Sequence, residues 1–186
     1  MTTPDQTLYQ TQWLSLHRRG HWDYVRRPHA EACVGVLAVT DARELVLVEQ
    51  FRVPVERRVI EIPAGLFGDE PEHAGESPAD CAARELFEET GFRAGSMEPL
   101  IVSPTSAGMT SEWTHLFHAT GLVRENGGGG VGGEEIVTHL VPVEELRPWF
   151  AAREAEGMGV DFKIHAALWL AGLGGPFHAL NPRGRL

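Results

Sequence analysis

Cysteine is scarce in this chain: Cys33 and Cys81 are the only two among 186 residues. Two cysteines are too few for a disulfide framework, so free thiols in a reducing compartment are expected. Long apolar runs are also missing, and a stretch such as Cys33–Val39 is far too short to span a bilayer. The first five residues lack the basic and apolar regions of a signal peptide. We therefore expect a cytoplasmic protein without a membrane partner.

Positive charge is in short supply as well. Sixteen lysines and arginines face 26 aspartates and glutamates, which leaves a formal net charge of −10. A protein that binds nucleic acid needs a basic face, so nucleic acid is excluded as the main partner. A small anionic substrate stays compatible with this charge, because a bound metal ion reverses the sign of the local potential.

Several catalytic motifs are absent from the sequence. It has no H-E-x-x-H, no G-x-S-x-G and no G-K-[ST], so hydrolases built on zinc, a serine nucleophile or a P-loop have no support. Of the nine histidines, His115 and His118 would face opposite sides of one strand and make a poor metal pair.

The pattern of apolar residues predicts an α/β fold in a single domain. Strands are predicted at Leu8–Leu16, Trp22–Arg27, Cys33–Val39, Leu45–Phe51 (a hairpin with the preceding strand), Arg58–Ile62, near Leu100, at Trp113–His118 and at Ile136–Val141. Helices are predicted at Pro78–Thr90, Val143–Leu146, Pro148–Ala155 and Phe162–Leu173, with Pro148 breaking the second from the third. The glycine-rich stretch Gly127–Gly133 is interpreted as a flexible loop.

The helix predicted at Pro78–Thr90 carries the informative chemistry. Ser77 is a good N-cap, Pro78 suits the first helical position, and Gly91 ends the helix. At 3.6 residues per turn three glutamates share one side of this helix: Glu85, Glu88 and Glu89. The apolar stripe at helical spacing consists of other residues: Ala79, Ala82, Ala83 and Leu86.

Two interpretations of the three glutamates follow from the residues alone. Carboxylates at this spacing repel one another, and a hard divalent cation such as Mg²⁺, which prefers oxygen ligands, would compensate. A solvated acidic face, as on many surface helices, is the alternative.

The segment Arg84-Glu-Leu-Phe-Glu-Glu-Thr-Gly-Phe92 resembles the Nudix signature, R-E-apolar-x-E-E-x-G-apolar, at every specified position. Glu76 stands where the signature has its leading glutamate, and Ala64-Gly65 resembles its opening. The spacing between Gly65 and Glu76 departs from the pattern, because Leu66–Gly75 contains a five-residue insertion.

Flanking motifs resemble the ADP-ribose pyrophosphatase branch of that family. These motifs are Val48–Arg52, Glu61–Gly65, Ser103–Glu112 and Asp161–Lys163. The resemblance implies an α/β/α sandwich around a mixed sheet, and a homodimer held by N-terminal strands. On this basis residues 1–30 are predicted to form a dimerisation element, residues 31–174 the hydrolase domain and residues 175–186 a tail.

The resemblance also assigns roles to individual residues. Glu85, Glu88 and Glu89 would hold Mg²⁺, for which Mn²⁺ could substitute, and Arg84 would orient them. Ala64 would offer its backbone carbonyl to the metal. Glu112, near the end of a loop that could swing over the substrate, would act as general base or as a further metal ligand.

Four substrate contacts are predicted, each with a plainer alternative. Arg52 would bind the diphosphate or be an ordinary surface arginine. Glu61 would contact the base or ribose or merely point outward from its strand. Trp22 and Tyr24 would stack on the nucleobase or pack at a sheet edge.

The function implied is metal-dependent cleavage of the diphosphate in ADP-ribose or a related nucleoside diphosphate sugar, giving a nucleoside monophosphate and a sugar phosphate. Another diphosphate, such as coenzyme A, a dinucleotide or a nucleoside triphosphate, is the first alternative. A binding module of the same fold without catalysis is the second; the complete set of Arg84 and three glutamates speaks against it.

Overall fold

The computed structural model describes residues 4–69, 71–130 and 135–174. Its strands are β1 Asp5–Gln10, β2 Ser15–Arg19, β3 Trp22–Arg26, β4 Ala32–Val39, β5 Glu44–Arg52, β6 Arg57–Glu61, β7 Ala64–Phe67, β8 Phe92–Arg93, β9 Ser96–Pro104, β10 Trp113–Thr120, β11 Val123–Arg124, β12 Val137–Pro142 and β13 Gly159–Val160. Its α-helices are α1 Pro78–Thr90, α2 Leu146–Ala155 and α3 Phe162–Leu170, and short 3-10 helices lie at Val53–Val55, Pro71–His73 and Val143–Glu145.

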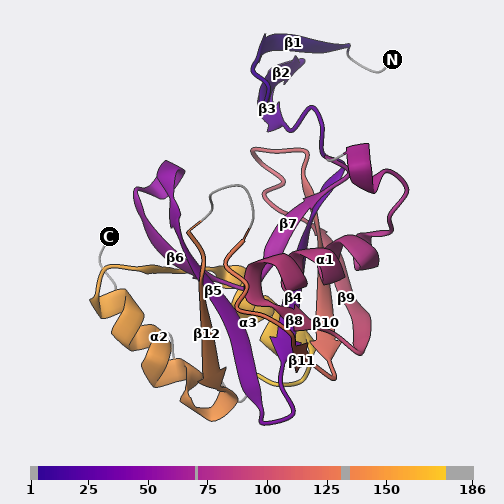
Figure 1. Ribbon diagram of the computed structural model, residues 1–186. Helices are drawn as coiled ribbons and strands as arrows, with labels where there is room; N and C mark the ends of the chain where they lie inside the picture. The colour runs from indigo at the N-terminus through magenta and orange to yellow at the C-terminus, as the bar shows by residue number, and fades with distance from the viewer. Residues whose placement is uncertain (1–3, 70, 131–134, 175–186) are drawn as a thin grey trace.

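The centre of the molecule is an eight-stranded mixed sheet (Figure 1). Its main path runs β13-β6-β5-β4-β10-β9, and β12 and β7 pair with β5 and β4. Strands β4 and β10 are parallel, whereas β4 and β5 are antiparallel. The mixed α/β sheet predicted from the sequence is therefore confirmed.

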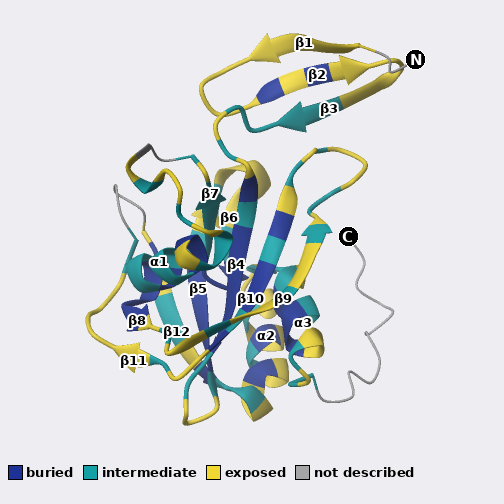
Figure 2. Cartoon of the chain, turned by 90° about the vertical axis from the view of Figure 1, so that its right-hand side faces the viewer, coloured by how far each residue is buried: buried dark blue, intermediate teal, exposed yellow. Residues whose placement is uncertain are grey.

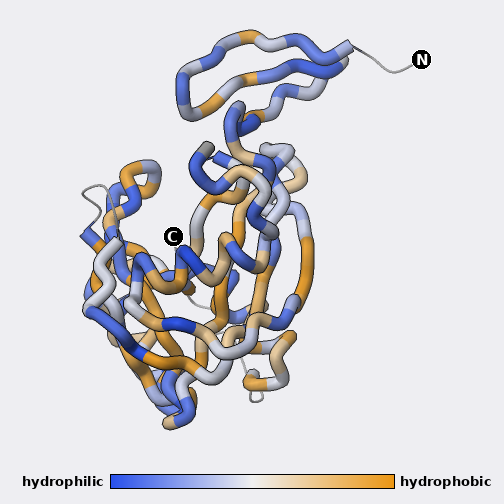
Figure 3. Tube along the Cα trace, turned by 45° about the vertical axis from the view of Figure 1, so that its right-hand side comes forward, coloured by the Kyte–Doolittle hydropathy of each residue, from blue (hydrophilic) through white to orange (hydrophobic). Residues whose placement is uncertain are grey.

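Helices cover both faces of this sheet and bury two apolar clusters. Leu86 and Cys81 of α1 pack against Val34, Val36 and Val46 on one face. On the other face, α2 and α3 cover the second cluster, whose buried members include Leu37, Leu45, Leu47, Ile60, Phe150 and Ile164. Figure 3 shows the apolar segments concentrated along the strands between these helices. The sheet thereby gives α1 a rigid support.

The N-terminal strands form a separate antiparallel sheet, β1-β2-β3, which extends away from α1 (Figures 1 and 2). The single strand predicted at Leu8–Leu16 is wrong, because the chain turns between β1 and β2. The Thr11 hydroxyl accepts hydrogen bonds from the amides of Trp13 and Leu14, which stabilises this turn.

The predicted hairpin of β4 and β5 is confirmed, although it is paired only near its turn, at Ala38↔Val46 and Val39↔Leu45. Beyond these residues β7 pairs with β4 in place of β5, and β10 pairs with the other edge of β4. Two other predictions need correction. Pro148 does not break a helix, since it lies in the first turn of α2, where its missing N–H costs nothing. The last helix ends at Leu170, before the predicted Leu173.

Two further predictions concern segments that are described only in part or not at all. The described part of the predicted flexible loop, Gly127–Gly130, is hydrogen-bonded to a helix: the amides of Gly129 and Gly130 donate to carbonyls at the end of α1. The rest of the glycine-rich stretch and the predicted tail, residues 175–186, lie outside the described residues. No helix in the described part of the chain is both long and apolar enough to cross a membrane.

Candidate functional site

Local sequence signals define the acidic helix. The Ser77 hydroxyl accepts from the amide of Asp80, and the Asp80 carboxylate accepts from the amide of Ser77, which forms a capping box. Pro78 occupies the first turn, and Gly91 ends α1 in the left-handed conformation with φ of 74°. The predicted boundaries of this helix are therefore confirmed. Leu86, on the side of α1 that faces the sheet, is fully buried, and its burial fixes which side of the helix carries the glutamates.

Arg84 is the hub of the carboxylate cluster. Its Nη1 donates to Oε1 of Glu85 at 3.0 Å and to Oε2 of Glu88 at 3.3 Å. Its Nη2 donates to Oε1 of Glu76 at 3.0 Å. Glu76 thus reaches Arg84 in spite of the insertion before it, and this hydrogen bond lowers the pKa of Glu76. One guanidinium holds three carboxylates in a defined arrangement.

The start of strand β7, Ala64-Gly65, lies directly against the side chains of Glu85 and Glu89 and forms a wall beside them. The amide of Ala64 donates to Oε2 of Glu89 at 3.1 Å, and the Glu89 side chain is nearly buried. A Cβ atom on Gly65 would lie 2.0 Å from the carboxyl carbon of Glu85. A side chain at this position would displace the Glu85 carboxylate from its place beside the strand.

The donor chemistry of this region suits a hard divalent cation. Burial raises the pKa of Glu85 to about 7, with Arg84 opposing and the charge of Glu88 adding to the rise. A buried carboxylate with a raised pKa lies where extra positive charge is favourable. The side chains are turned toward Arg84 and Ala64, and within the described residues no three His, Cys, Asp or Glu side chains already converge as metal ligands. The groups that could hold such an ion here are the Ala64 carbonyl and the carboxylates of Glu85, Glu88 and Glu89.

Arg52 and Glu61 pair with each other on adjacent strands. The Nε atom of Arg52 donates to Oε2 of Glu61 at 2.7 Å, and Glu61 is buried at 6% exposure. Glu61 therefore does not point outward to solvent. Burial lowers the pKa of Arg52, but the hydrogen bond to Glu61 and the charges of Glu61 and Glu89 give a net rise. Arg52 thus lies within electrostatic reach of the acidic helix.

Glu112 is held by an arginine that the sequence did not single out. The Nε atom of Arg27 donates to Oε2 of Glu112 at 2.7 Å, across 85 positions of sequence. The loop before Glu112 is also tied to β3, since the amide of Val25 donates to the Met109 carbonyl and the amide of Ser111 to the Val25 carbonyl. In this structure the loop is docked on β3, although the sequence suggested that it could swing.

Trp22 and Tyr24 lie on β3, in the sheet that extends away from α1 (Figure 1). The Tyr24 hydroxyl donates to the Asp5 carboxylate, and its ring stacks on His17 with ring centroids 5.5 Å apart. Trp22 is half exposed. Within one chain these aromatic residues are not brought together with Glu85, Glu88 and Glu89.

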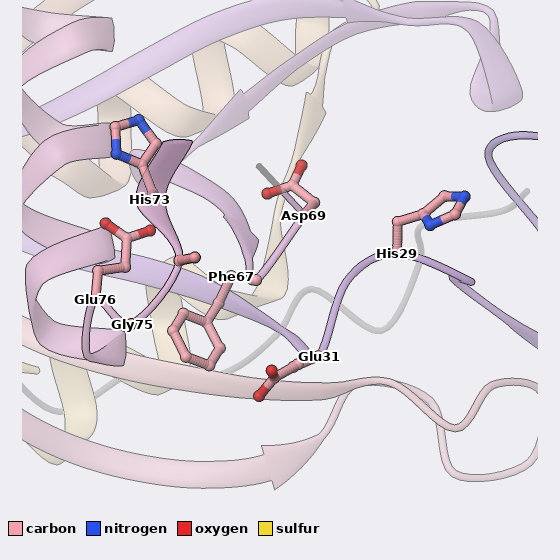
Figure 4. Close-up of a pocket in the computed structure, with 9 residues that line it drawn as sticks. His29, Glu31, Phe67, Asp69, His73, Gly75 and Glu76 are labelled. Atoms are coloured by element: carbon pink, nitrogen blue, oxygen red, sulfur yellow. The ribbon is translucent and has the colours of Figure 1, made fainter. Parts of the chain in front are cut away.

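The insertion builds a cavity of about 460 Å³ beside the carboxylate cluster (Figure 4). Its lining comes from His29 and Glu31 before β4, and from Phe67, Gly68, Asp69, His73, Ala74, Gly75 and Glu76. Glu76 belongs both to this lining and to the Arg84 cluster. The segment Leu66–Gly75 therefore supplies much of the surface next to the acidic helix.

Comparison with known proteins agrees with this geometry. The family model of the NUDIX domain matches residues 29–160. The chain is 41% identical over 115 residues to the methanol dehydrogenase activator of Bacillus methanolicus, covering 62% of this chain and 58% of that protein. It is 42% identical over 100 residues to the ADP-ribose pyrophosphatase of Bacillus subtilis (strain 168), covering 54% of this chain and 50% of that protein. The matches thus span only about half the length of these relatives.

A solved structure described as an ADP compounds hydrolase has the same fold. It superposes with a TM-score of 0.71 and covers 92% of this chain and 91% of its own, at 19% sequence identity.

Replacing Gly65 should damage the site without unfolding the protein. In Gly65→Ala the new methyl group would overlap the Glu85 carboxylate, so we expect divalent-metal affinity to fall by about 10–100-fold, as for lost support of a metal ligand. Titration of each purified protein with Mn²⁺, followed by electron paramagnetic resonance, measures this affinity. Gly108→Ala is the matched control, because nothing lies within 4 Å of a Cβ there. Equal affinity in both variants would contradict the role given to the β7 wall.

Proposed function

Because the chain belongs to the Nudix family, we propose that it is a divalent-metal-dependent pyrophosphohydrolase. Its substrate is ADP-ribose or a related nucleoside diphosphate sugar, and its products are a nucleoside monophosphate and a sugar phosphate. The observation that carries this proposal is the Arg84 cluster, in which Glu85 and Glu88 are held beside the Ala64-Gly65 wall that contacts Glu89. The similarity to an ADP-ribose pyrophosphatase over 100 residues supports the substrate class.

Mg²⁺ is the ion we propose, with Mn²⁺ as a substitute. All the groups offered to it are oxygens, which both ions accept and Mg²⁺ prefers. When bound, the ion would neutralise charge on the diphosphate and favour attack by water at phosphorus. Arg84 would keep Glu85 and Glu88 in place before the ion arrives, as a positioning partner does.

The remaining charged residues would bind substrate and move a proton. Arg52 would contact the diphosphate. Glu61 accepts a hydrogen bond from the Nε atom of Arg52, and would hold the guanidinium so that it could donate two hydrogen bonds to a phosphate. The attacking water must lose a proton, and we propose that Glu112 accepts it. Because Arg27 holds Oε2 of Glu112, the other carboxylate oxygen would take the proton.

The N-terminal sheet supports a homodimer. Tyr9, Trp13 and Trp22 are 68%, 71% and 52% exposed, and all six residues of β1 are exposed (Figure 2). Exposed apolar side chains gathered on one small sheet are typical of an association surface. In such a dimer Trp22 would contact a nucleobase only in the partner's site, because it lies away from α1 of its own chain; Tyr24, already enclosed by His17 and Asp5, fits the packing role better. The cytoplasmic location and the absence of nucleic-acid and membrane partners stay predictions.

The substrate assignment predicts that ADP-ribose with Mg²⁺ yields AMP and ribose 5-phosphate. Chromatography of reactions with ADP-ribose, a GDP-sugar, coenzyme A, a dinucleotide and a nucleoside triphosphate would resolve the products. Excess chelator should abolish turnover. Glu89→Gln, which removes the negative charge and one carboxylate oxygen, should lose most of it. Cleavage of coenzyme A or a triphosphate with ADP-ribose intact would favour the alternative substrates; no cleavage of any of them would favour a binding module.

The role of Glu112 predicts a split between the kinetic constants. Glu112→Gln should lower kcat by about 10²–10⁴-fold and leave KM nearly unchanged, because a base acts mainly in the transition state. Steady-state kinetics with the best substrate measures both, and Glu98→Gln on the exposed face of β9 is the control. Wild-type kcat in Glu112→Gln would assign the proton to another group.

The association surface predicts a particle of about twice the 20.4 kDa chain mass. Multi-angle light scattering at micromolar concentration measures it. Trp13→Glu places a charge on a side chain that is 71% exposed in the single chain, and should shift the particle toward the monomer. A wild-type monomer would refute the homodimer.

A further inference from the structure

Glu88 and Glu89 lie in the last turn of α1, where a helix is least secure. The last four carbonyls of a helix have no partner within it, so this turn frays unless other groups bind them. The same end of the helix carries the negative pole of its dipole, which disfavours nearby carboxylates. The two glutamates therefore occupy a turn that needs outside support.

Residues Gly128–Gly130, which we call the glycine clamp, supply that support. The amide of Gly129 donates to the Glu89 carbonyl at 2.8 Å, and the amide of Gly130 donates to the Glu88 carbonyl at 3.1 Å. The Thr138 hydroxyl adds a third hydrogen bond, to the Glu89 carbonyl at 3.3 Å. These donors also place positive partial charge at the negative pole of the helix.

Glycine is required for this contact on steric grounds. Gly128 has φ of +64°, and a Cβ atom on it would lie 2.5 Å from the Glu89 carbonyl oxygen and from the Thr90 backbone. No other residue can bring the backbone this close to the helix end. The side chain of Asn126 helps to shape the clamp, because its Oδ1 accepts from the amide of Gly128 at 2.8 Å.

Glu89 is consequently fixed at both ends. The clamp binds its main-chain carbonyl, and Ala64 binds its carboxylate at 3.1 Å. We propose that the glycine clamp is a positioning element for the metal-binding glutamates, and that it sets the affinity of the site for a divalent cation. This inference rests on the proposed function, since it takes Glu88 and Glu89 to be metal ligands.

The test is a titration of the substrate-free protein with Mn²⁺, followed by electron paramagnetic resonance. Gly128→Ala pushes the clamp off the helix end, so we expect Mn²⁺ affinity to fall by about 10–100-fold. Gly127→Ala is the matched neighbour, because a Cβ there meets nothing within 4 Å, and it should bind as wild type does. A folded Gly128→Ala protein with wild-type affinity would overturn the proposal.

A second variant keeps the test decisive if Gly128→Ala does not fold. Thr138→Val preserves side-chain size but removes one donor to the Glu89 carbonyl, which the clamp also binds, and should weaken Mn²⁺ binding several-fold in a protein that stays folded by circular dichroism. Unchanged affinity would overturn the positioning role. If the wild-type protein itself binds no Mn²⁺, the metal-dependent function fails first, and the clamp proposal fails with it.

Discussion

Repulsion among glutamates on one helix is the constraint around which this structure is organised. Glu85, Glu88 and Glu89 share a side of α1, and two of them lie in its last turn, at the negative pole of the dipole. Three kinds of contact offset this repulsion. Arg84 donates hydrogen bonds to the carboxylates of Glu85 and Glu88, and the Ala64 amide donates to the carboxylate of Glu89. Two glycine amides donate to carbonyls at the helix end. Glu85 nevertheless keeps a raised pKa, because burial outweighs its partners. The divalent cation that we propose would compensate the negative charge that these partners leave unbalanced.

The position of the insertion explains why the fold tolerates it. The chain is anchored before the insertion, where β7 pairs with β4, and after it, where Ser77 caps α1 and Glu76 binds Arg84. Lengthening a loop between two anchored ends adds little free energy, because closure entropy grows slowly with length. The added residues instead line a cavity beside the cluster.

The N-terminal segment is linked to the hydrolase domain at the loop that carries Glu112. β3 exchanges backbone hydrogen bonds with this loop, and Arg27, just past β3, holds the Glu112 carboxylate. A surface suited to association and a candidate general base are thus connected by one short stretch of chain.

The sequence by itself determined the acidic helix, its caps and the order of most strands. These features depend on neighbours within a few residues: Ser77 with Asp80, Gly91 at the helix end, and glutamates at helical spacing. It could not determine that β4 pairs with β10 on one edge and with β7 beyond the hairpin on the other, that Arg27 meets Glu112 across 85 positions, or that Gly65 and Gly129 approach the glutamates. Those contacts join residues far apart in the chain, and a local sequence pattern does not predict which distant residues will meet. Only the packed sheet, which fixes where each strand ends, brings them together.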